Sequence, residues 1–330
     1  MERPVFKPLG SSLYDLDTPS LFVIRDRILT NTKAYRSQVC EMGKRLTPNA
    51  SIHRTPSLCR LLNQNEVYVN TVSEALEFSN VISGRITIGR AFQPSQLATI
   101  LAISRIVPIR VVASSENQIC EMESLVHGKT ENVSFVLRVS GLPEQRGTPL
   151  KDLNGKQEFI SGYLVSDIGV EDSITFLSDI CPQLSLSGLP VIVESTEYLK
   201  PDALDVDFDE LVEGLHPFKG GPDFSVGVIA AVVSTPESGK AFLDCGQKAI
   251  STDGGVPTVA DSKSLAIERM SAEHGYLVWK PGEASIGLGD TFILEPASIS
   301  DTFNLYDYLN IVEGEILVGL LDIQCRGSYS

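Results

Sequence analysis

The chain has 330 residues, of which 42% are hydrophobic, as in a globular protein of about two domains. Its 27 basic and 42 acidic residues give a formal net charge of -15, which disfavours nucleic acid and anionic membranes as partners. Residues 1–20 contain no apolar signal segment, and no later run is long enough to span a membrane. The six cysteines show no CxxC spacing, as expected of reduced thiols. These features predict a cytoplasmic protein.

Up to about residue 225, short β-branched runs alternate with helical patterns. The runs lie at residues 20–24, 67–72, 85–90, 108–114, 133–139 and 191–195. Helices are predicted from the spacing of Ile28, Tyr35, Val39 and Met42, from Thr55 and Pro56 as N-cap and first helical residue, and at residues 93–106 and 171–180. Such a series predicts a parallel sheet covered by helices, closed into an eight-stranded α/β barrel of the TIM type.

Beyond residue 225 the pattern becomes all β. Runs with turn residues between them lie at 226–235, 240–246, 274–279, 290–296 and 308–323. We therefore predict a barrel domain over residues 1–224 and a C-terminal all-β domain over residues 225–330, with the N-terminal segment partly joining the β domain.

The stretch PNASIHRTPSLCRLL, residues 48–62, lies between a short strand and the helix that begins near Thr55. In a βα barrel the loops that follow the strands carry the active site, so His53 and Arg54 are expected at the mouth of the barrel. The alternative is that both are ordinary polar loop residues beside a helix N-terminus. Position alone leaves both interpretations open.

Five motifs stand along the chain: DLDTPSLFV at 15–23, FLDCGQKAISTDGGVP at 242–257, SAEHG at 271–275, GLGDTFILEP at 287–296 and CRGSY at 325–329. In this order and spacing they resemble those of the fold type III family of D-threonine aldolases and eukaryotic D-serine dehydratases. The resemblance covers nearly the whole chain. It implies an alanine racemase-like barrel followed by a β domain, a pyridoxal phosphate (PLP) cofactor, a divalent metal and a homodimer.

The lysine that forms the family's Schiff base is replaced. Where the resemblance places this lysine, in a Pro-His-x-Lys-Thr-His motif, the sequence has Ser51, with Asn49 before it and His53 after it. A hydroxyl cannot form an imine with an aldehyde. The guanidinium of Arg54 is no substitute, because it stays protonated at ordinary pH. Lys44 lies upstream, at the end of the preceding helix, and has little weight as a replacement.

The family's metal ligands are also replaced. The resemblance aligns them with residues 296–300, where Ser298 and Ser300 stand instead. Neutral hydroxyls are poor ligands for zinc or manganese, and Asp301 has no paired ligand beside it. The sequence thus predicts that no divalent metal is bound.

The family's other PLP contacts are altered as well. Its Gly-rich phosphate cradle corresponds to VIVESTEYLK at 191–200, where Glu194 and Glu197 would repel a phosphate. Ser166 stands where the resemblance implies a ring-contacting tyrosine, with Tyr163 nearby. Arg146 approximates the family's Arg-x-Gly turn. Together with the missing lysine, these changes predict that PLP is not bound.

The first functional hypothesis is a PLP-independent enzyme on this scaffold. It would be a cyclase, isomerase or lyase of specialised metabolism, because an emptied barrel mouth can fold a flexible small molecule into a reactive conformer. The candidate catalytic residues are His53, Arg146, Glu273 and His274, and the candidate substrate-binding residues are Asn49, Ser51, Arg54, Tyr163, Ser166, Ser298, Ser300 and Asp301. The alternative for the adjacent Glu273 and His274 is a structural hydrogen-bonded pair.

Two other hypotheses remain. A catalytically inactive relative could bind a ligand, or a partner through the family's dimer surface. The polar residues kept around Ser51 favour a site that still acts on a small molecule over this alternative. A conventional PLP-dependent aldolase or dehydratase would need another lysine, such as Lys219 or Lys248, to reach the site.

Overall fold

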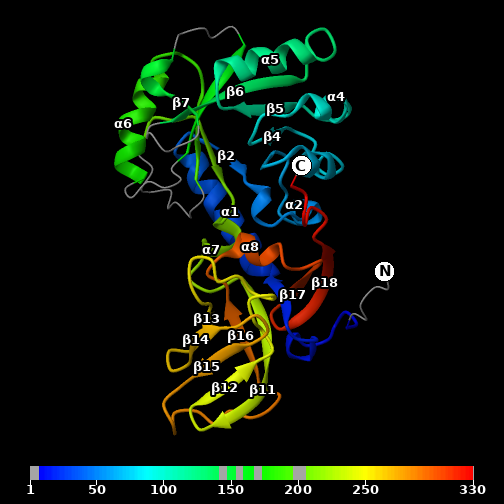
Figure 1. The fold of residues 1–330 in the computed structure, drawn as a ribbon, viewed down its shortest axis with the longest axis vertical. Helices are drawn as coiled ribbons and strands as arrows, with labels where there is room; N and C mark the ends of the chain where they lie inside the picture. The colour runs from blue at the N-terminus through cyan, green and yellow to red at the C-terminus, as the bar shows by residue number, and fades with distance from the viewer. Residues whose placement is uncertain (1–6, 141–146, 154–158, 167–172, 196–205, 330) are drawn as a thin grey trace. The chain divides into compact units, whose positions relative to one another are not determined.

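The computed structural model describes residues 7–140, 147–153, 159–166, 173–195 and 206–329. The chain forms two compact units (Figure 1). The unit that we call the β unit comprises Met1–Asn31, Ile52–Thr55 and Pro217–Arg326, and the barrel unit comprises Thr32–Ser51, Pro56–His216 and Gly327–Ser330. The longest segment of the barrel unit ends at His216, whereas the sequence predicted the domain boundary after residue 224.

The barrel unit is built on a parallel sheet. Within the described residues its ring contains eight strands: β2 (Arg45–Pro48), β3 (Val67–Val69), β4 (Ile86–Ile88), β5 (Ile109–Ala113), β6 (Val133–Ser140), β8 (Ile160–Ser166), β9 (Val191–Glu194) and β10 (Glu210–Glu213). The strand order is β2-β10-β9-β8-β6-β5-β4-β3, and a short β7 (Thr148–Pro149) pairs with β6. A parallel bridge between Asn49 and Tyr68 joins the two ends. The predicted closed barrel is thereby confirmed.

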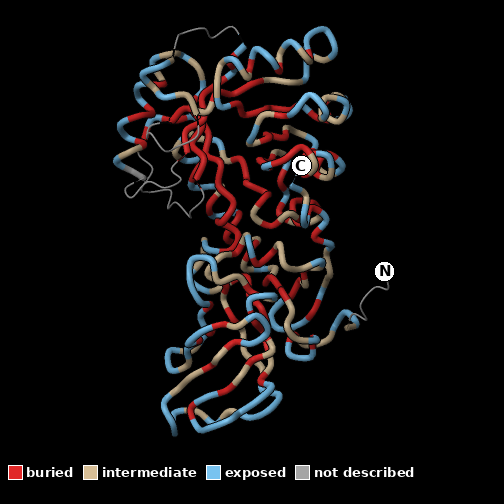
Figure 2. The backbone as a smooth tube through the Cα atoms, viewed as in Figure 1, coloured by how far each residue is buried: buried red, intermediate tan, exposed pale blue. Residues whose placement is uncertain are grey.

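The strand sequences explain the barrel, because both faces of each strand are buried (Figure 2). One buried cluster takes a single side chain from each of six strands: Tyr68, Val112, Val136, Leu164, Ile192 and Val212. Two residues before Val112 and Val212 stand Arg110 and Glu210, which pair with each other although β5 and β10 are not neighbours in the sheet. This face is therefore the barrel interior.

The interior at the amino ends of the strands is charged. Glu210 accepts hydrogen bonds from two nitrogens of Arg110, from Arg45 and from the hydroxyl of Thr47, the last at 2.7 Å. Arg110 also donates to Thr87 at 3.0 Å. Burial raises the pKa of Glu210, but the hydrogen bonds and charges of Arg110, then of Arg45, lower it to about 2. The network thus keeps a buried carboxylate ionised.

Helices follow most strands of the barrel unit. They are α2 (Pro56–Leu61), α3 (Val72–Phe78), α4 (Leu97–Ser104), α5 (Glu116–Val126) and α6 (Ser173–Ser185), with 3₁₀ turns η2 (Ala50–Ile52), η3 (Pro94–Gln96) and η4 (Leu150–Asp152). The expected start of α2 at Pro56 and the helix within residues 93–106 are confirmed. In α1 (Arg25–Glu41) the buried face carries Ile28, Tyr35 and Val39, as their spacing predicted. No helix in the described ranges is both long and apolar enough to cross a membrane.

The β unit contains a mostly antiparallel sheet in the order β14-β15-β12-β11-β1-β17-β18, with β16 pairing with β11 and β13. Its strands are β1 (Ser20–Ile24), β11 (Val226–Glu237), β12 (Lys240–Leu243), β13 (Thr258–Val259), β14 (Ala266–Met270), β15 (Gly275–Val278), β16 (Thr291–Glu295), β17 (Tyr308–Glu313) and β18 (Ile316–Asp322). The unit also has η1 (Leu13–Asp15) and α8 (Ile299–Phe303), and α7 (His216–Lys219) leads into it.

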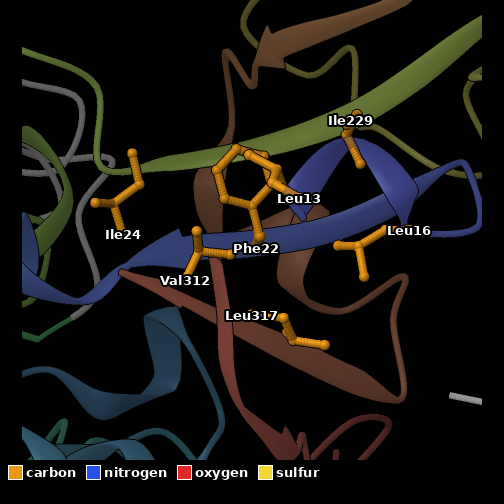
Figure 3. Packing of buried hydrophobic residues seen from close by; sticks show 7 residues of the cluster. All are labelled: Leu13, Leu16, Phe22, Ile24, Ile229, Val312 and Leu317. Atoms are coloured by element: carbon orange, nitrogen blue, oxygen red, sulfur yellow. The ribbon is translucent and has the colours of Figure 1, made fainter. Parts of the chain in front are cut away.

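The core of the β unit includes a cluster around Phe22 of β1 (Figure 3). Phe22 is fully buried and packs with Leu13, Ile229, Val312 and Leu317. The run at residues 20–24 therefore belongs to this sheet, where it pairs with β11 and β17, and not to the barrel ring. Phe22 and Ile24 of β1 pack in one cluster with Leu13 of η1 and with residues of the neighbouring strands.

Candidate active site at the barrel mouth

Ser51 lies in η2, directly after β2 at the carboxyl end of the barrel, and is only 2% exposed. Its hydroxyl donates to Oε2 of Glu74 at 2.9 Å and accepts from the backbone N–H of Asn70 at 2.7 Å. Its own backbone N–H donates to the side chain of Asn49 at 3.2 Å. Asn49 and Ser51, two of the predicted site residues, are therefore held together at the mouth.

Glu74 is in this position because it lies in the first turn of α3. Thr71 is the N-cap of this helix, and its hydroxyl accepts from the N–H of Glu74 at 3.1 Å, while Oε2 of Glu74 accepts from the N–H groups of Thr71 and Asn70. This reciprocal arrangement is a capping box, and a carboxylate is favourable in the first turn of a helix. The Thr-x-x-Glu spacing at residues 71–74 is visible in the sequence, and it was the signal that could have identified Glu74.

A second polar cluster joins three other strand ends. Arg138 of β6 donates to Glu194 of β9 at 2.6 Å, to the hydroxyl of Tyr68 of β3 at 3.2 Å and to the carbonyl of Gly89 at 3.3 Å. A Cβ at Gly89 would meet the Tyr68 hydroxyl at 2.0 Å, so glycine is needed for this close approach. Glu194, which the sequence analysis expects to repel a phosphate, forms an ion pair with Arg138.

The cluster keeps fixed protonation states. Burial lowers the pKa of Arg138, but the charges and hydrogen bonds of Glu194 and Tyr68 together raise it above its usual value, so the guanidinium stays charged. Burial, and then the charge of Glu194, raise the pKa of Tyr68 well above its usual value. Arg138 therefore acts as a permanent cation and donor, and Tyr68 as a neutral hydroxyl.

A third cluster follows β10. Oε2 of Glu213 lies 2.6 Å from Nδ1 of His216, and the carboxylate also accepts from the backbone N–H groups of Leu215 and His216. The imidazole stacks on Tyr35, with ring centroids 4.9 Å apart and planes 9° apart. Its Nε2 is buried and has no hydrogen-bond partner among the described residues. Because Nδ1 is the atom that donates to the carboxylate, Nε2 carries the lone pair in the neutral ring.

The two predicted residues of β8 differ in direction. Ser166 is two residues from Leu164, which belongs to the interior cluster, so it faces the interior at the carboxyl end and is 7% exposed. Tyr163 is one residue from Leu164 and therefore faces the opposite side of the sheet. The predicted role of Tyr163 in substrate binding stays a prediction.

His53 and Arg54 belong to the β unit. Nδ1 of His53 accepts from the backbone N–H of Thr55 at 3.1 Å, and its ring meets Phe218 edge-on at 6.5 Å. Arg54 has a positive φ of 52° and donates to the side chain of Asn304 at 2.5 Å. These contacts fit the interpretation of both residues as structured loop residues.

The remaining candidates of the β unit also have local partners. Glu273 forms an exposed ion pair with Lys248, and Nδ1 of His274 lies 3.2 Å from the carbonyl of Leu243. Ser298 donates to Asp301 at 2.6 Å, beside Ser300 in α8. Arg146 lies outside the described residues. His53, Glu273 and His274 belong to a different unit from Ser51. Their catalytic roles stay predictions.

Comparisons with known proteins agree with this architecture. Residues 225–312 match the family model described as a putative serine dehydratase domain. A D-threonine aldolase from Arthrobacter sp is 23% identical over 359 residues, which cover 96% of this chain and 95% of that protein.

Solved structures resemble the whole chain. A D-threonine aldolase from Filomicrobium marinum matches with a TM-score of 0.89 at 22% identity, covering 99% of this chain and 100% of that one. The D-threo-3-hydroxyaspartate dehydratase from Delftia sp. HT23 matches with a TM-score of 0.80 at 18% identity, over 94% and 98% of the chains. An alanine racemase from Clostridium difficile 630 matches with a TM-score of 0.67 at 10% identity, over 92% and 98%.

The barrel and the β sheet define an alanine racemase-like fold. The chain is similar in sequence to a D-threonine aldolase and, over residues 225–312, to the putative serine dehydratase domain, so the resemblance inferred from the motifs is confirmed.

Proposed function

We propose that this protein is an enzyme that acts noncovalently on a small molecule at the barrel mouth, without PLP or a divalent metal. The observation that carries the proposal is the environment of Ser51. A buried hydroxyl, held by Glu74 and the amide of Asn70, stands where the family resemblance places the Schiff-base lysine.

The described lysines do not supply an alternative amine for PLP. In the barrel unit, Lys33, Lys129 and Lys151 are exposed on the surface. Lys44 donates to carbonyls of Val206 and Phe208, which precede β10 and so lie at the amino ends of the strands. The lysines that the structure describes in the barrel unit therefore do not fit a covalently bound PLP.

The two lysines considered as replacements belong to the β unit. The ammonium of Lys248 pairs with Glu273, and its side chain is 71% exposed. Lys219 is the last residue of α7. Neither position offers the buried, desolvated amine that a Schiff-base lysine requires.

The residues at the implied metal position do not fit a metal either. Ser298 donates its hydroxyl to Asp301, so the one carboxylate there is already bonded by a neighbour. Over the described residues, no group of three His, Cys, Asp or Glu side chains is arranged to hold a metal ion. Hydroxyl oxygens alone are weak ligands for zinc or manganese.

The mouth retains polar groups that face the barrel interior. Arg138 can stabilise negative charge that develops on a substrate oxygen, and Ser51 and Ser166 offer hydroxyl groups at the same end of the barrel. Glu213 directly follows the interior residue Val212, so it faces the outer side of the sheet, where its partner His216 stacks on Tyr35 of α1. The interior set supports a cyclase, isomerase or lyase that acts by charge stabilisation and hydrogen bonding.

A second candidate is a catalytically inactive protein that binds a ligand or a partner. It is favoured by the mutual satisfaction of Arg138 with Glu194 and of Ser51 with Glu74, which is typical of groups with a structural role. The homodimer and the cytoplasmic location stay predictions, as does the small-molecule substrate.

Metabolite profiling distinguishes the two candidates. The purified protein is incubated in D₂O with a mixture of polar metabolites and analysed by mass spectrometry. We expect one or a few compounds to be consumed or to gain deuterium, and we expect this change to disappear with Arg138→Met/Glu194→Leu, which removes the cation at the mouth and leaves no buried charge unpaired. A Glu121→Gln substitution in α5 is the control.

If no compound changes, or if both variants leave the turnover intact, the proposed enzyme at this site is contradicted and the binding protein is favoured. D-Threonine and D-threo-3-hydroxyaspartate are included with PLP and Mn²⁺. Cleavage of either one would restore a conventional aldolase or dehydratase.

A further inference from the structure

The segment Gly327–Tyr329 belongs to the barrel unit, although the residues just before it belong to the β unit. The carbonyl of Ser328 accepts from the hydroxyl of Thr71 at 3.0 Å, and the carbonyl of Tyr329 accepts from Arg90 at 2.5 Å. We call Gly327–Tyr329 the strap.

The strap crosses two adjacent strand ends. Thr71 lies two residues after β3, and Arg90 lies two residues after β4. These strands pair in parallel with Val69 opposite Ile88, so their carboxyl ends are neighbours. The carboxyl ends are the side of a βα barrel on which active sites lie.

The strap is linked to Ser51 through one short piece of backbone. Thr71 holds Ser328, and the preceding residue, Asn70, donates its amide hydrogen to Ser51 and Glu74. The hydroxyl of Thr71 also accepts from the amide of Glu74 as the cap of α3. One capping residue therefore supports both the strap and the acceptor of the Ser51 hydroxyl.

The described anchors of the strap suit a reversible closure. The hydrogen bonds from Thr71 and Arg90 use backbone carbonyls of the strap, and the side chain of Arg90 is exposed. The side chain of Tyr329 is 61% exposed, so it contributes little apolar burial. Gly327 has φ of +73° where the chain enters the barrel unit, a conformation that favours glycine at a turn. Segments with few buried contacts open at low free-energy cost.

We propose that the strap is a gate that closes the β3–β4 side of the barrel mouth over Ser51. It limits access while its two carbonyls are bound and admits a ligand when they are released. The inference rests on the proposed function, in that the mouth is taken as the site, but its test needs no substrate.

The test measures the accessibility of a thiol at position 51. Ser51→Cys is made in the full chain and in a chain that ends at Arg326, and each is labelled with N-ethylmaleimide under native conditions and mapped by mass spectrometry. We expect removal of the strap to raise the labelling rate at position 51 by about tenfold or more. Arg90→Ala should give a smaller rise, and Arg105→Ala, at the exposed end of α4, should give none.

Native cysteines provide internal controls. Cys40 and Cys120 are exposed and should react at the same rate in every variant, whereas buried Cys181 should stay slow. Equal labelling at position 51 with and without the strap would overturn the proposal. A parallel rise at Cys181 would also overturn it, because the strap would then support the whole unit.

Hydrogen exchange gives a second readout without the Ser51→Cys substitution. The amide of Asn70 should exchange faster in the chain that ends at Arg326, while amides of β9 remain unchanged. Unchanged exchange at Asn70 would contradict the gate. Because neither readout uses turnover or PLP, the gate can fail while the proposed function stands, and the reverse also holds.

Discussion

Replacing Glu210 with alanine is expected to lower the free energy of unfolding by about 3–5 kcal/mol, because it leaves the buried Arg110 without a counter-charge. Arg110 has only 5% of its side chain exposed and spans the barrel interior to reach Glu210. Urea unfolding followed by circular dichroism measures the loss. Glu313→Ala is the control. Glu313 forms an exposed ion pair with Arg25 in the β unit, so we expect a loss below about 1 kcal/mol there.

The pH dependence should carry the same signature. The pKa of Glu210 falls from 4.5 to about 2 in the folded chain, so its contribution to stability is present above pH 4.5 and is lost as the pH falls towards 2. Wild type should therefore lose more stability than Glu210→Ala across this window. The account is contradicted if the free energies of unfolding of wild type and Glu210→Ala change in parallel with pH. It is also contradicted if Glu210→Ala loses less than about 1 kcal/mol at neutral pH, because the network would then not stabilise the barrel.

Replacing Arg138 with methionine should also cost about 3–5 kcal/mol, since Glu194 would remain as a buried charge without its cation. The double variant Arg138→Met/Glu194→Leu should recover much of this loss, because both charges are then absent. The double-mutant cycle is completed by Glu194→Leu alone and is measured by urea unfolding.

An exposed pair is the control for this cycle. Arg326 and Asp307 are 46% and 61% exposed in their side chains, and Arg326→Ala should cost less than about 1 kcal/mol. If Arg138→Met costs no more than this exposed pair, or if the double variant is no more stable than the single one, the pairing of Arg138 with Glu194 at the mouth is not as described.

The fold was accessible from sequence because its signals are local. Short β-branched runs alternating with helices predicted the barrel, and the pattern beyond residue 225 predicted the β sheet. The run at residues 20–24 has the same composition as a barrel strand, and only its pairing with β11 and β17 shows that it lies in the β sheet. Composition cannot reveal the partner of a strand.

The site was less predictable, because its pairs join residues that are distant in the chain. Arg138 and Glu194 are separated by 56 residues, and no local pattern shows that both point into one barrel. Glu213 and His216 are close in sequence, yet their strand was not recognised, so the pair was missed. Asn49 and Ser51 were found because the family motif marks their position directly.

The most direct test of the account is whether PLP forms a covalent link to this chain. The protein is incubated with PLP, reduced with borohydride, desalted, and examined by absorbance, intact mass and peptide mapping, with a known PLP-dependent enzyme as positive control. A hydroxyl at position 51 predicts no aldimine absorbance and an unmodified mass of 35.8 kDa. An aldimine band with a reduced adduct on a single lysine would contradict the account and make this chain a conventional member of its group.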